Sequence, residues 1–373
     1  MNDTEVGLSR PRHDTGWSRE VVTVKSAIVV PPKNARYRKP AGVLYPDGRH
    51  CLHSANWRFD NALTTPPEMP DQIQGRAKGK WLWGGVLFDH FGHFLIESLS
   101  RLWALDRTTG LRGVIFIPRR PRRGSQLLGF QRAVLQCLDV DLQFRIVRRN
   151  AVVDELVVPG QGLGLGPPDV EGVNLACGTP ETRQYFKNHF ATEIEPDGPD
   201  MLYVSRARLE LATGGLAGED QLEILMAEQG YEIFHPETVD IATQIARYKA
   251  ARKIVFSDGS AAHLFALVAR PDQSIAYIRR RSYWSEGPID HITGFSGRHP
   301  IAIDALSGQW EPLPNSQYKR TSIGQLDLPI LGRQLEAAGF VDDGSNWPEL
   351  DVVKLSKLMN QQGLTDAFAF NPT

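Results

Sequence analysis

Four chemically reactive side chains recur at every fourth residue within the apolar segment 83–103: Asp89, His93, Glu97 and Arg101. In a helix, this spacing puts all four on one stripe. Acidic, basic and cationic groups are costly to bury unless they are paired or in use. We therefore expect a functional stripe at the wall of a cleft. The structural alternative is an N-terminal cap followed by an ion pair between Glu97 and Arg101.

A metal site is a third interpretation of the same segment, because His90, His93 and Glu97 have the composition of a metal triad. His90, however, lies off the stripe that the other two share, and the spacing therefore argues against zinc. The three cysteines of the chain are widely spaced and include no CxxC pair. Neither a disulfide framework nor a thiolate metal site is supported.

A second polar group lies in the turn Ser257–Ser260, between an apolar strand and an apolar helix. Gly259 permits close approach of the backbone, and Ser260 is predicted to cap a helix whose free N–H groups attract anions. Ser205 and Arg206 follow a neighbouring strand, where a guanidinium offers bidentate contacts to phosphate. The pattern suits a phosphorylated ligand. A plain capped turn and a surface arginine are the alternatives.

The composition is that of a globular protein with more than one core. The chain has 373 residues, of which 41% are hydrophobic and 23% charged, so two domains are expected. The net charge of −1 gives no general case for nucleic acid. The polar N-terminus lacks the apolar core of a signal peptide, and no apolar run approaches the roughly 20 residues of a spanning helix. A cytoplasmic location is expected.

Apolar periodicity predicts the elements that position these groups. In the first half we expect strands at 21–24, 27–30, 114–117, 144–147 and 155–158. Besides the helix that carries the stripe, we expect helices at 126–138 and 182–190, and a loop at 160–168. In the second half, strands at 201–204, 231–234, 254–256 and 274–278 alternate with helices at 219–229, 240–251 and 260–268. This alternation predicts βαβ units with a parallel sheet, and Asp240 as a helix cap. Beyond residue 300 we expect irregular structure, apart from a helix near 352–359.

Together these segments resemble glycosyltransferase family 61. The histidine–glutamate segment GHFLIESLSRLW at 92–103 is similar to that of the family, as are LYVSR at 202–206 followed by LAGE at 216–219, YEIFHPE at 231–237, and the turn at Gly259. Their order and spacing cover residues 81–280. One departure stands out: the family usually has a histidine before this glycine, where the chain has Asp258. His263, one turn further on, could take over part of that role.

The resemblance implies an α/β fold of the GT-B type, in which two Rossmann-like domains face each other across a cleft. Residues 1–195 would form the N-terminal, acceptor-side domain and residues 196–295 the nucleotide-sugar-binding domain. Residues 296–373 would be a C-terminal extension that packs back on the body. The resemblance also implies an inverting transfer from a nucleotide sugar, expected to be UDP-linked, with no metal or other cofactor.

The expected base is Glu97 or His93, with Asp89 as a third candidate. The expected donor-binding residues all lie in the matching segments of the second half: Ser205, Arg206, Glu219, His235, Glu237, Asp258, Gly259, Ser260 and His263.

The expected function is that of a hexosyl- or pentosyltransferase in the synthesis of bacterial surface or extracellular polysaccharide, such as capsule. Its partners would be a nucleotide sugar and a saccharide acceptor, a lipid-linked acceptor included. The arginine cluster Arg119, Arg120, Arg122 and Arg123 could guide an anionic acceptor or bind the inner face of the membrane, and a solvated basic loop is the alternative. A second cluster follows the strand at 274–278, at residues 279–281.

Two other functions fit parts of the pattern. The charge of Asp258 motivates a degenerate, non-catalytic module that binds sugar or a partner. Ser260, His263 and Asp258 have the residue types of a hydrolase triad. Three such residues within one turn cannot form the separated relay which that mechanism needs, and no GxSxG elbow is present.

Overall fold

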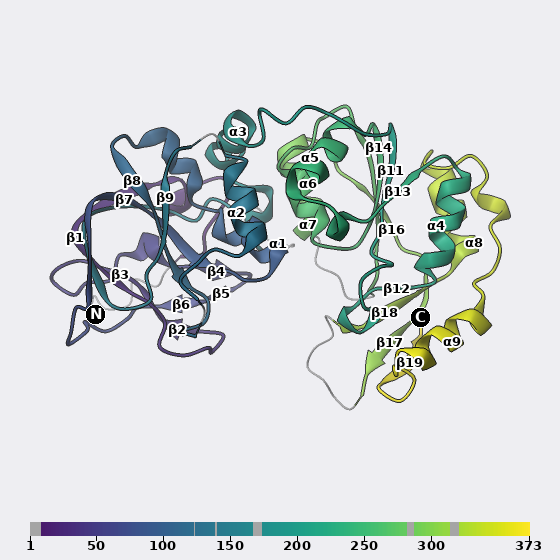
Figure 1. Ribbon diagram of the computed structural model, residues 1–373, viewed down its shortest axis with the longest axis horizontal. Coiled ribbons are helices and arrows are strands. Elements are labelled where there is room, and N and C mark those ends of the chain that lie inside the picture. Colours follow the sequence, from purple (N-terminus) through teal and green to yellow (C-terminus); the bar gives the residue numbers. More distant parts are fainter. Residues whose placement is uncertain (1–8, 123, 139, 167–173, 282–286, 314–320) are drawn as a thin grey trace. The chain divides into compact units, whose positions relative to one another are not determined.

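The computed structural model describes residues 9–122, 124–138, 140–166, 174–281, 287–313 and 321–373 (Figure 1). The chain divides into two compact units, Met1–Glu193 and Ile194–Thr373. The sequence interpretation placed the boundary after residue 195 and set residues 296–373 apart. In the structure those C-terminal residues belong to the second unit.

The first unit is built on a mixed sheet of six strands in the order β3-β1-β10-β7-β8-β9. These are β1 (Val21–Val30), β3 (Gly42–Leu44), β7 (Gly75–Leu87), β8 (Leu111–Pro118), β9 (Gln143–Ile146) and β10 (Ala151–Pro159). Strands β10, β7, β8 and β9 run parallel, whereas β1 and β3 pair antiparallel. The expected strands at 21–30, 114–117, 144–147 and 155–158 are confirmed.

The long strand β7 was missed, because its glycines break the apolar alternation that identifies a strand. A Cβ on Gly84 would collide with the ring of Phe116. Gly85 has a φ of +84°, and a Cβ there would lie 2.8 Å from Nη1 of Arg101. Both glycines are therefore needed where β7 passes close to its neighbours.

The remaining elements of the first unit are short. Helices α1 (Phe91–His93), α2 (Gly129–Gln136) and α3 (Pro180–His189) are joined by the π-helical turn η3 (Phe94–Ser98) and the 3-10 helices η1 (Gly16–Arg19), η2 (Leu52–Ser54), η4 (Leu102–Arg107) and η5 (Leu175–Cys177). Two-stranded pairs are formed by β2 (Lys39–Pro40) with β6 (Thr64–Thr65), and by β4 (Trp57–Arg58) with β5 (Asn61–Ala62). The predicted loop has no regular structure over 160–166, and its last two residues, 167 and 168, lie outside the described residues.

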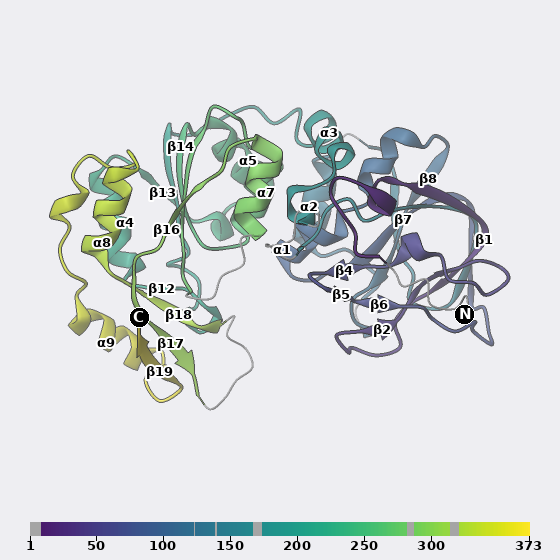
Figure 2. The ribbon, with the colours of Figure 1, turned by 180° about the vertical axis from the view of Figure 1, so that it is seen from behind.

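The second unit contains the predicted parallel sheet. Its strand order is β13-β11-β14-β15-β16, with β11 (Met201–Val204), β13 (Glu232–Phe234), β14 (Lys253–Ser257), β15 (Ser274–Ile278) and β16 (Ile301–Ile303). All of these pairings are parallel. Helices α5 (Ile241–Ala250), α6 (Ala261–Ala266) and α7 (Gly287–Ser296) lie on one face, and α4 (Glu219–Glu228) and α8 (Leu328–Ala337) on the other (Figures 1 and 2). Asp240 caps α5 as predicted, because its side chain accepts a hydrogen bond from the Thr243 N–H.

The prediction of an irregular tail was wrong. A second sheet has the order β12-β18-β17-β19, formed by β12 (Leu216–Ala217), β17 (Leu306–Pro312), β18 (Ile323–Leu326) and β19 (Phe368–Pro372). Helix α9 (Val352–Gln361) confirms the expected helix near 352–359. The strands escaped notice because they are short and because glycine and proline interrupt their pattern. Among the described residues, no helix combines the length and the apolar character needed to cross a bilayer.

Candidate functional site

The predicted stripe begins at the end of β7, on an irregular helix rather than a continuous α-helix. The Phe94 N–H bonds to the His90 carbonyl, and the Leu99 N–H reaches back five residues to the Phe94 carbonyl at 3.3 Å. Ser98 fixes this π-helical turn to the strand: its Oγ accepts from the Phe88 N–H at 2.9 Å and donates to the Val86 carbonyl at 3.0 Å. Such turns occur frequently at functional sites.

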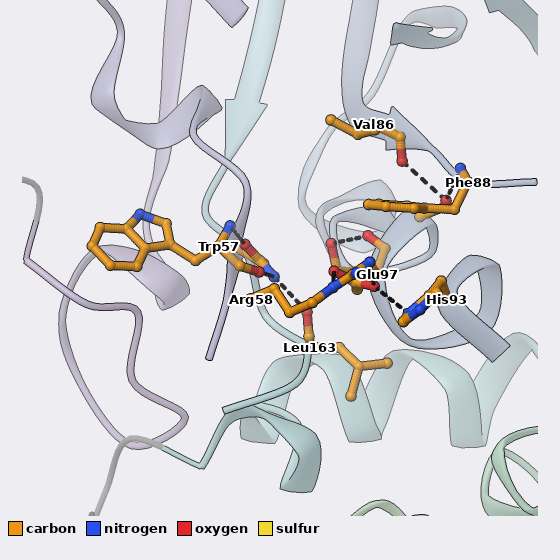
Figure 3. A network of polar contacts seen from close by, with 10 residues as sticks. Trp57, Arg58, Val86, Phe88, His93, Glu97 and Leu163 are labelled. Carbon is orange, nitrogen blue, oxygen red and sulfur yellow. Dashed lines mark hydrogen bonds and ion pairs between the residues drawn. The ribbon is translucent and has the colours of Figure 1, made fainter. Parts of the chain in front are cut away.

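Glu97 is itself fully buried and projects from this turn into a polar cluster (Figure 3). Arg58, on β4, donates to both carboxylate oxygens, from Nε to Oε1 at 3.0 Å and from Nη2 to Oε2 at 2.6 Å. His93 Nδ1 lies 2.8 Å from Oε2 of the same carboxylate. The carboxylate is therefore held by a guanidinium fork on one side and an imidazole on the other.

The electrostatics of this cluster keep Glu97 ionised. Burial by itself raises the pKa of Glu97, but the charges and hydrogen bonds of Arg58 and His93 outweigh it and lower that pKa from 4.5 to about 2. Burial lowers the pKa of Arg58, and the Glu97 carboxylate outweighs this effect and raises it. A carboxylate with so low a pKa is a weak proton acceptor at neutral pH.

His93 is the member of the cluster that reaches solvent, with 31% of its side chain exposed. A carboxylate accepts hydrogen bonds, so the contact with Glu97 requires a proton on Nδ1 of His93. In the neutral ring, Nε2 is then the acceptor atom. The ring lies 5.8 Å from that of Phe88 and 5.1 Å from that of His90. This arrangement fixes the orientation of the imidazole.

Two members of the predicted stripe lie elsewhere. Arg101 follows the π-helical turn, is fully buried, and donates to the carbonyls of His53 and Ala55. Burial lowers the pKa of Arg101 to about 9. The ion pair between Glu97 and Arg101, which was the structural alternative, is not formed, since Arg58 takes that place. Asp89 is exposed, between β7 and α1.

Arg58 is the residue that sequence reasoning missed. It lies 39 positions before Glu97 in the hairpin of β4 and β5, and its local sequence carries no signal of this role. The metal interpretation concerned His90, His93 and Glu97. Within the described ranges, no group of three or more histidine, cysteine or acidic side chains is arranged to hold a metal ion.

The predicted phosphate-side residues of the second unit gather where the parallel strands end. Ser205 and Arg206 follow β11, His235 follows β13, Asp258 and Gly259 follow β14, and Arg279, Arg280 and Arg281 follow β15. The carboxyl ends of parallel strands meet at one edge of a sheet, where open α/β sheets bind their ligands.

A buried carboxylate at the start of α4 organises this edge. Oε1 of Glu219 accepts hydrogen bonds from the Arg206 N–H at 2.9 Å, from the Tyr203 hydroxyl at 3.0 Å, and from the Ser257 hydroxyl. Burial raises the pKa of Glu219. The side chain thus joins the ends of β11 and β14 and fixes the backbone at Arg206.

Asp258 lies among arginines. Its Oδ1 accepts from the Tyr277 hydroxyl at 2.8 Å, and its Oδ2 lies 3.5 Å from Arg280 Nε and 3.6 Å from Arg281 Nη2. Arg206 packs against the same turn: a Cβ on Gly259 would lie 2.7 Å from Arg206 Nη1. Two guanidinium groups therefore lie near the Asp258 carboxylate, and a third, that of Arg206, packs against the adjacent Gly259, which makes this turn rich in positive charge.

Three other predicted donor residues have structural partners of their own. His235 Nε2 lies 3.4 Å from Glu223 Oε1, which also accepts from the Ser205 hydroxyl at 2.6 Å. His235 Nδ1 is 3.9 Å from Glu237 Oε1. His263 is buried, with Nδ1 3.1 Å from His291 Nδ1.

The prediction that Ser260 caps the following helix was wrong. Ser260 has helical dihedral angles, and its side chain makes no capping hydrogen bond. The helix, α6, has six residues and ends at Ala266, two residues before the predicted end.

Group-transfer enzymes use an imidazole oriented by a carboxylate to abstract a proton. They use positively charged edges of parallel sheets to bind phosphate. The two units of this chain have one site of each kind. The sequence model of the family Glycosyltransferase 61 matches residues 91–275, a range that includes His93, Glu97, Arg206 and Asp258. The chain belongs to this family of sugar transferases through that domain, which confirms the resemblance. A comparison with curated proteins gives no match.

Proposed function

We propose that this protein transfers a sugar from a nucleotide-sugar donor to a saccharide acceptor with inversion at the anomeric carbon. The observation that carries the proposal is the contact of His93 Nδ1 with the buried, ionised Glu97 at 2.8 Å. The family supplies the class of reaction, and this contact supplies the base that such a displacement needs.

In this mechanism His93 is the base and Glu97 is its positioning residue. Nε2 of His93 takes the proton of the acceptor hydroxyl as its oxygen attacks the anomeric carbon. The bond from that carbon to the nucleoside diphosphate breaks, and the diphosphate leaves with the bonding electrons. Glu97 orients the ring and stabilises the imidazolium that forms. Arg58 keeps Glu97 ionised.

The donor diphosphate is assigned to the arginine-rich edge of the second unit. Three guanidinium groups, those of Arg206, Arg280 and Arg281, lie at this edge with two carboxylates, Asp258 and the buried Glu219. The pairing of Asp258 with arginines also meets the objection that its charge would repel a phosphate, which was the basis for the non-catalytic alternative. The proposal assigns neutralisation of the leaving group to guanidinium groups rather than to a metal ion or another cofactor.

The finer features expected from the resemblance belong to this proposal. They are the GT-B arrangement, UDP as the nucleotide, a hexosyl or pentosyl group as the cargo, and a place in the synthesis of bacterial capsule or other surface polysaccharide in the cytoplasm. The parallel sheet of the second unit supports a nucleotide-binding role for that unit.

We further propose that the acceptor is anionic or lipid-linked and meets a basic surface of the first unit. Arg119 Nη1 donates to the Arg36 carbonyl at 3.1 Å, and Lys39 Nζ donates to the Arg119 carbonyl at 2.8 Å. The buried Lys39 thus joins the two segments, and the exposed or half-buried arginines of 36–38 and 119–122 contribute one basic surface; Arg123 lies outside the described residues. Replacing Arg119, Arg120 and Arg122 by serine should reduce sedimentation with anionic vesicles. Equal partitioning of variant and wild type would remove this part of the proposal.

The function is tested by release of the nucleoside diphosphate from a panel of nucleotide sugars in the presence of saccharide acceptors. The wild type should release it from at least one donor. Arg206→Ala should raise the dissociation constant for that nucleotide roughly tenfold, as expected for one charged hydrogen bond. Arg208→Ala, a nearby arginine outside the proposed site, is the control. Failure to bind any nucleotide sugar or free diphosphate at millimolar concentration would favour the non-catalytic alternative.

A further inference from the structure

A small cavity of about 270 Å³ lies on the first unit, beside the hairpin of β4 and β5. Its lining includes Trp57, Arg38, Asp60, Asn61 and Thr65. Ligand pockets usually exceed about 300 Å³, so this cavity suits one small ring rather than a nucleotide.

Trp57, one of the lining residues, carries a hydrogen-bond donor without a partner. The side chain is only 9% exposed, and its Nε1 is buried without a hydrogen-bond partner in the part of the chain that the structure describes. A buried indole N–H usually finds an acceptor, and leaving one unpaired is costly. A ligand with an acceptor oxygen in the cavity would satisfy it.

The two residues of β4 project in opposite directions. Arg58 reaches Glu97, whereas the indole of Trp57 points away from it (Figure 3). This is the alternation of a strand. The cavity is therefore distinct from the Glu97 cluster, although adjacent residues line the two.

The backbone at Trp57 is rigidly held. Its N–H donates to Gln161 Oε1 at 2.8 Å, and its carbonyl accepts from Gln161 Nε2 at 3.0 Å. Gln161 is fully buried. A binding wall fixed in this way loses little conformational entropy when a ligand arrives.

The other lining groups favour a neutral ligand with several hydroxyl groups. Arg38 and Asp60 have opposite charges, and Asp60 also lies 3.2 Å from Nη1 of Arg10 at the surface. Asn61 and Thr65 add an amide and a hydroxyl, which both donate and accept. An aromatic wall, balanced charge and paired donors and acceptors match a sugar ring, which has an apolar face and a polar rim.

We propose that this cavity is a saccharide-binding subsite, separate from the proposed base. It would hold a sugar unit of the acceptor or product chain against Trp57, with a ring or hydroxyl oxygen accepting from Nε1. The choice of ligand rests on the proposed transfer to a saccharide. The site itself does not depend on which residue acts as the base.

Side-chain NMR of the full chain labelled with ¹⁵N-tryptophan tests the subsite directly. The chain has eight tryptophans, and the signal missing in Trp57→Phe identifies Nε1 of Trp57. The probes are the methyl glycosides of glucose, galactose, mannose, xylose and N-acetylglucosamine, each added to about 50 mM to detect millimolar affinities. At least one glycoside should shift the Trp57 signal progressively until binding saturates, and should leave most of the other indole signals in place.

Asn61→Ala and Asn188→Ala form a matched pair of variants. Asn61 lines the cavity, whereas Asn188 lies exposed at the end of α3. Loss of one hydrogen bond should weaken sugar binding about fivefold in Asn61→Ala and leave it unchanged in Asn188→Ala. If Trp57→Phe does not fold, the indole signal that Asn61→Ala perturbs identifies Trp57.

The proposal is overturned if no glycoside shifts the Trp57 signal, if all indole signals shift alike, or if the two asparagine variants bind equally well. The outcome is separable from that of the proposed function, because binding is read without turnover. A chain that lacks transferase activity could still bind sugar at Trp57, and an active chain could fail to bind it.

Discussion

At the scale of single residues, the proposed chemistry of the first unit centres on a carboxylate that holds an imidazole. The types and spacing of His93 and Glu97 predicted that the two side chains share one stripe of a helix. The third member, Arg58, could not be predicted, because the contact depends on a hairpin far away in the sequence. Its presence changes the assignment of roles, since it helps to lower the pKa of Glu97 to about 2.

The acid stability of Glu97→Gln tests this assignment. The pKa of Glu97 is lower in the folded protein, about 2, than its ordinary value of 4.5. Its contribution to stability is therefore fully present above about pH 4.5 and is lost as the pH falls through about 2. That contribution is roughly 3 kcal/mol, from the size of the pKa shift.

The free energy of unfolding of wild type and Glu97→Gln, measured by urea denaturation from pH 7 to pH 3, should therefore differ most near neutrality and converge in acid. A difference that stays constant over this range would show that the ionised carboxylate is not the stabilising form.

Asp258 shows how a residue can mislead when its neighbours are unknown. In the sequence it is an acidic residue where a phosphate is expected. In the structure it pairs with Arg280 and Arg281, which follow the next strand of the sheet. The sequence already contained both features, but only the parallel register of β14 and β15 brings them together.

At the scale of elements, the histidine–glutamate segment shows the limit of periodicity. Four-residue spacing put His93 and Glu97 on one stripe, and the two side chains meet because one turn of any α- or π-like helix brings them together. The spacing wrongly extended the stripe to Arg101, because the helix becomes a π-helical turn at Phe94–Ser98. The hydrogen bonds of Ser98 to β7 favour this turn, and an apolar pattern carries no signal for them.

Ser98→Ala should accordingly destabilise the protein. The Phe88 N–H is buried with Ser98 Oγ as its acceptor, so its loss should cost about 1 to 3 kcal/mol. Ser356→Ala, on the exposed face of α9, should stay within about 0.5 kcal/mol of wild type. Urea denaturation of the two variants measures both values. Equal effects would mean that Ser98 does not hold the turn.

At the scale of the whole molecule, the parallel sheet of the second unit was the most predictable part. Short apolar strands alternate there with helices, and both patterns are local. The missed elements depend on distant contacts: β7 needs glycines that fit against Phe116 and Arg101, and the second sheet pairs residues 216–217 with a strand more than a hundred residues later. The α/β class was thus predictable. The strand order and the partners of the buried charges were not.

The central claim is that the protein is a sugar transferase in which His93 takes the proton of the acceptor. It is tested most directly by comparing the turnover of wild type, His93→Ala and His90→Ala with the same donor and acceptor. His90 is the neighbouring, exposed imidazole, which the proposed mechanism does not use. His93→Ala should reduce kcat by roughly 10²- to 10⁴-fold, the usual contribution of general base catalysis, with unchanged affinity for the nucleotide. His90→Ala should retain wild-type turnover. Full activity in His93→Ala, or an equal loss in His90→Ala, would contradict the claim.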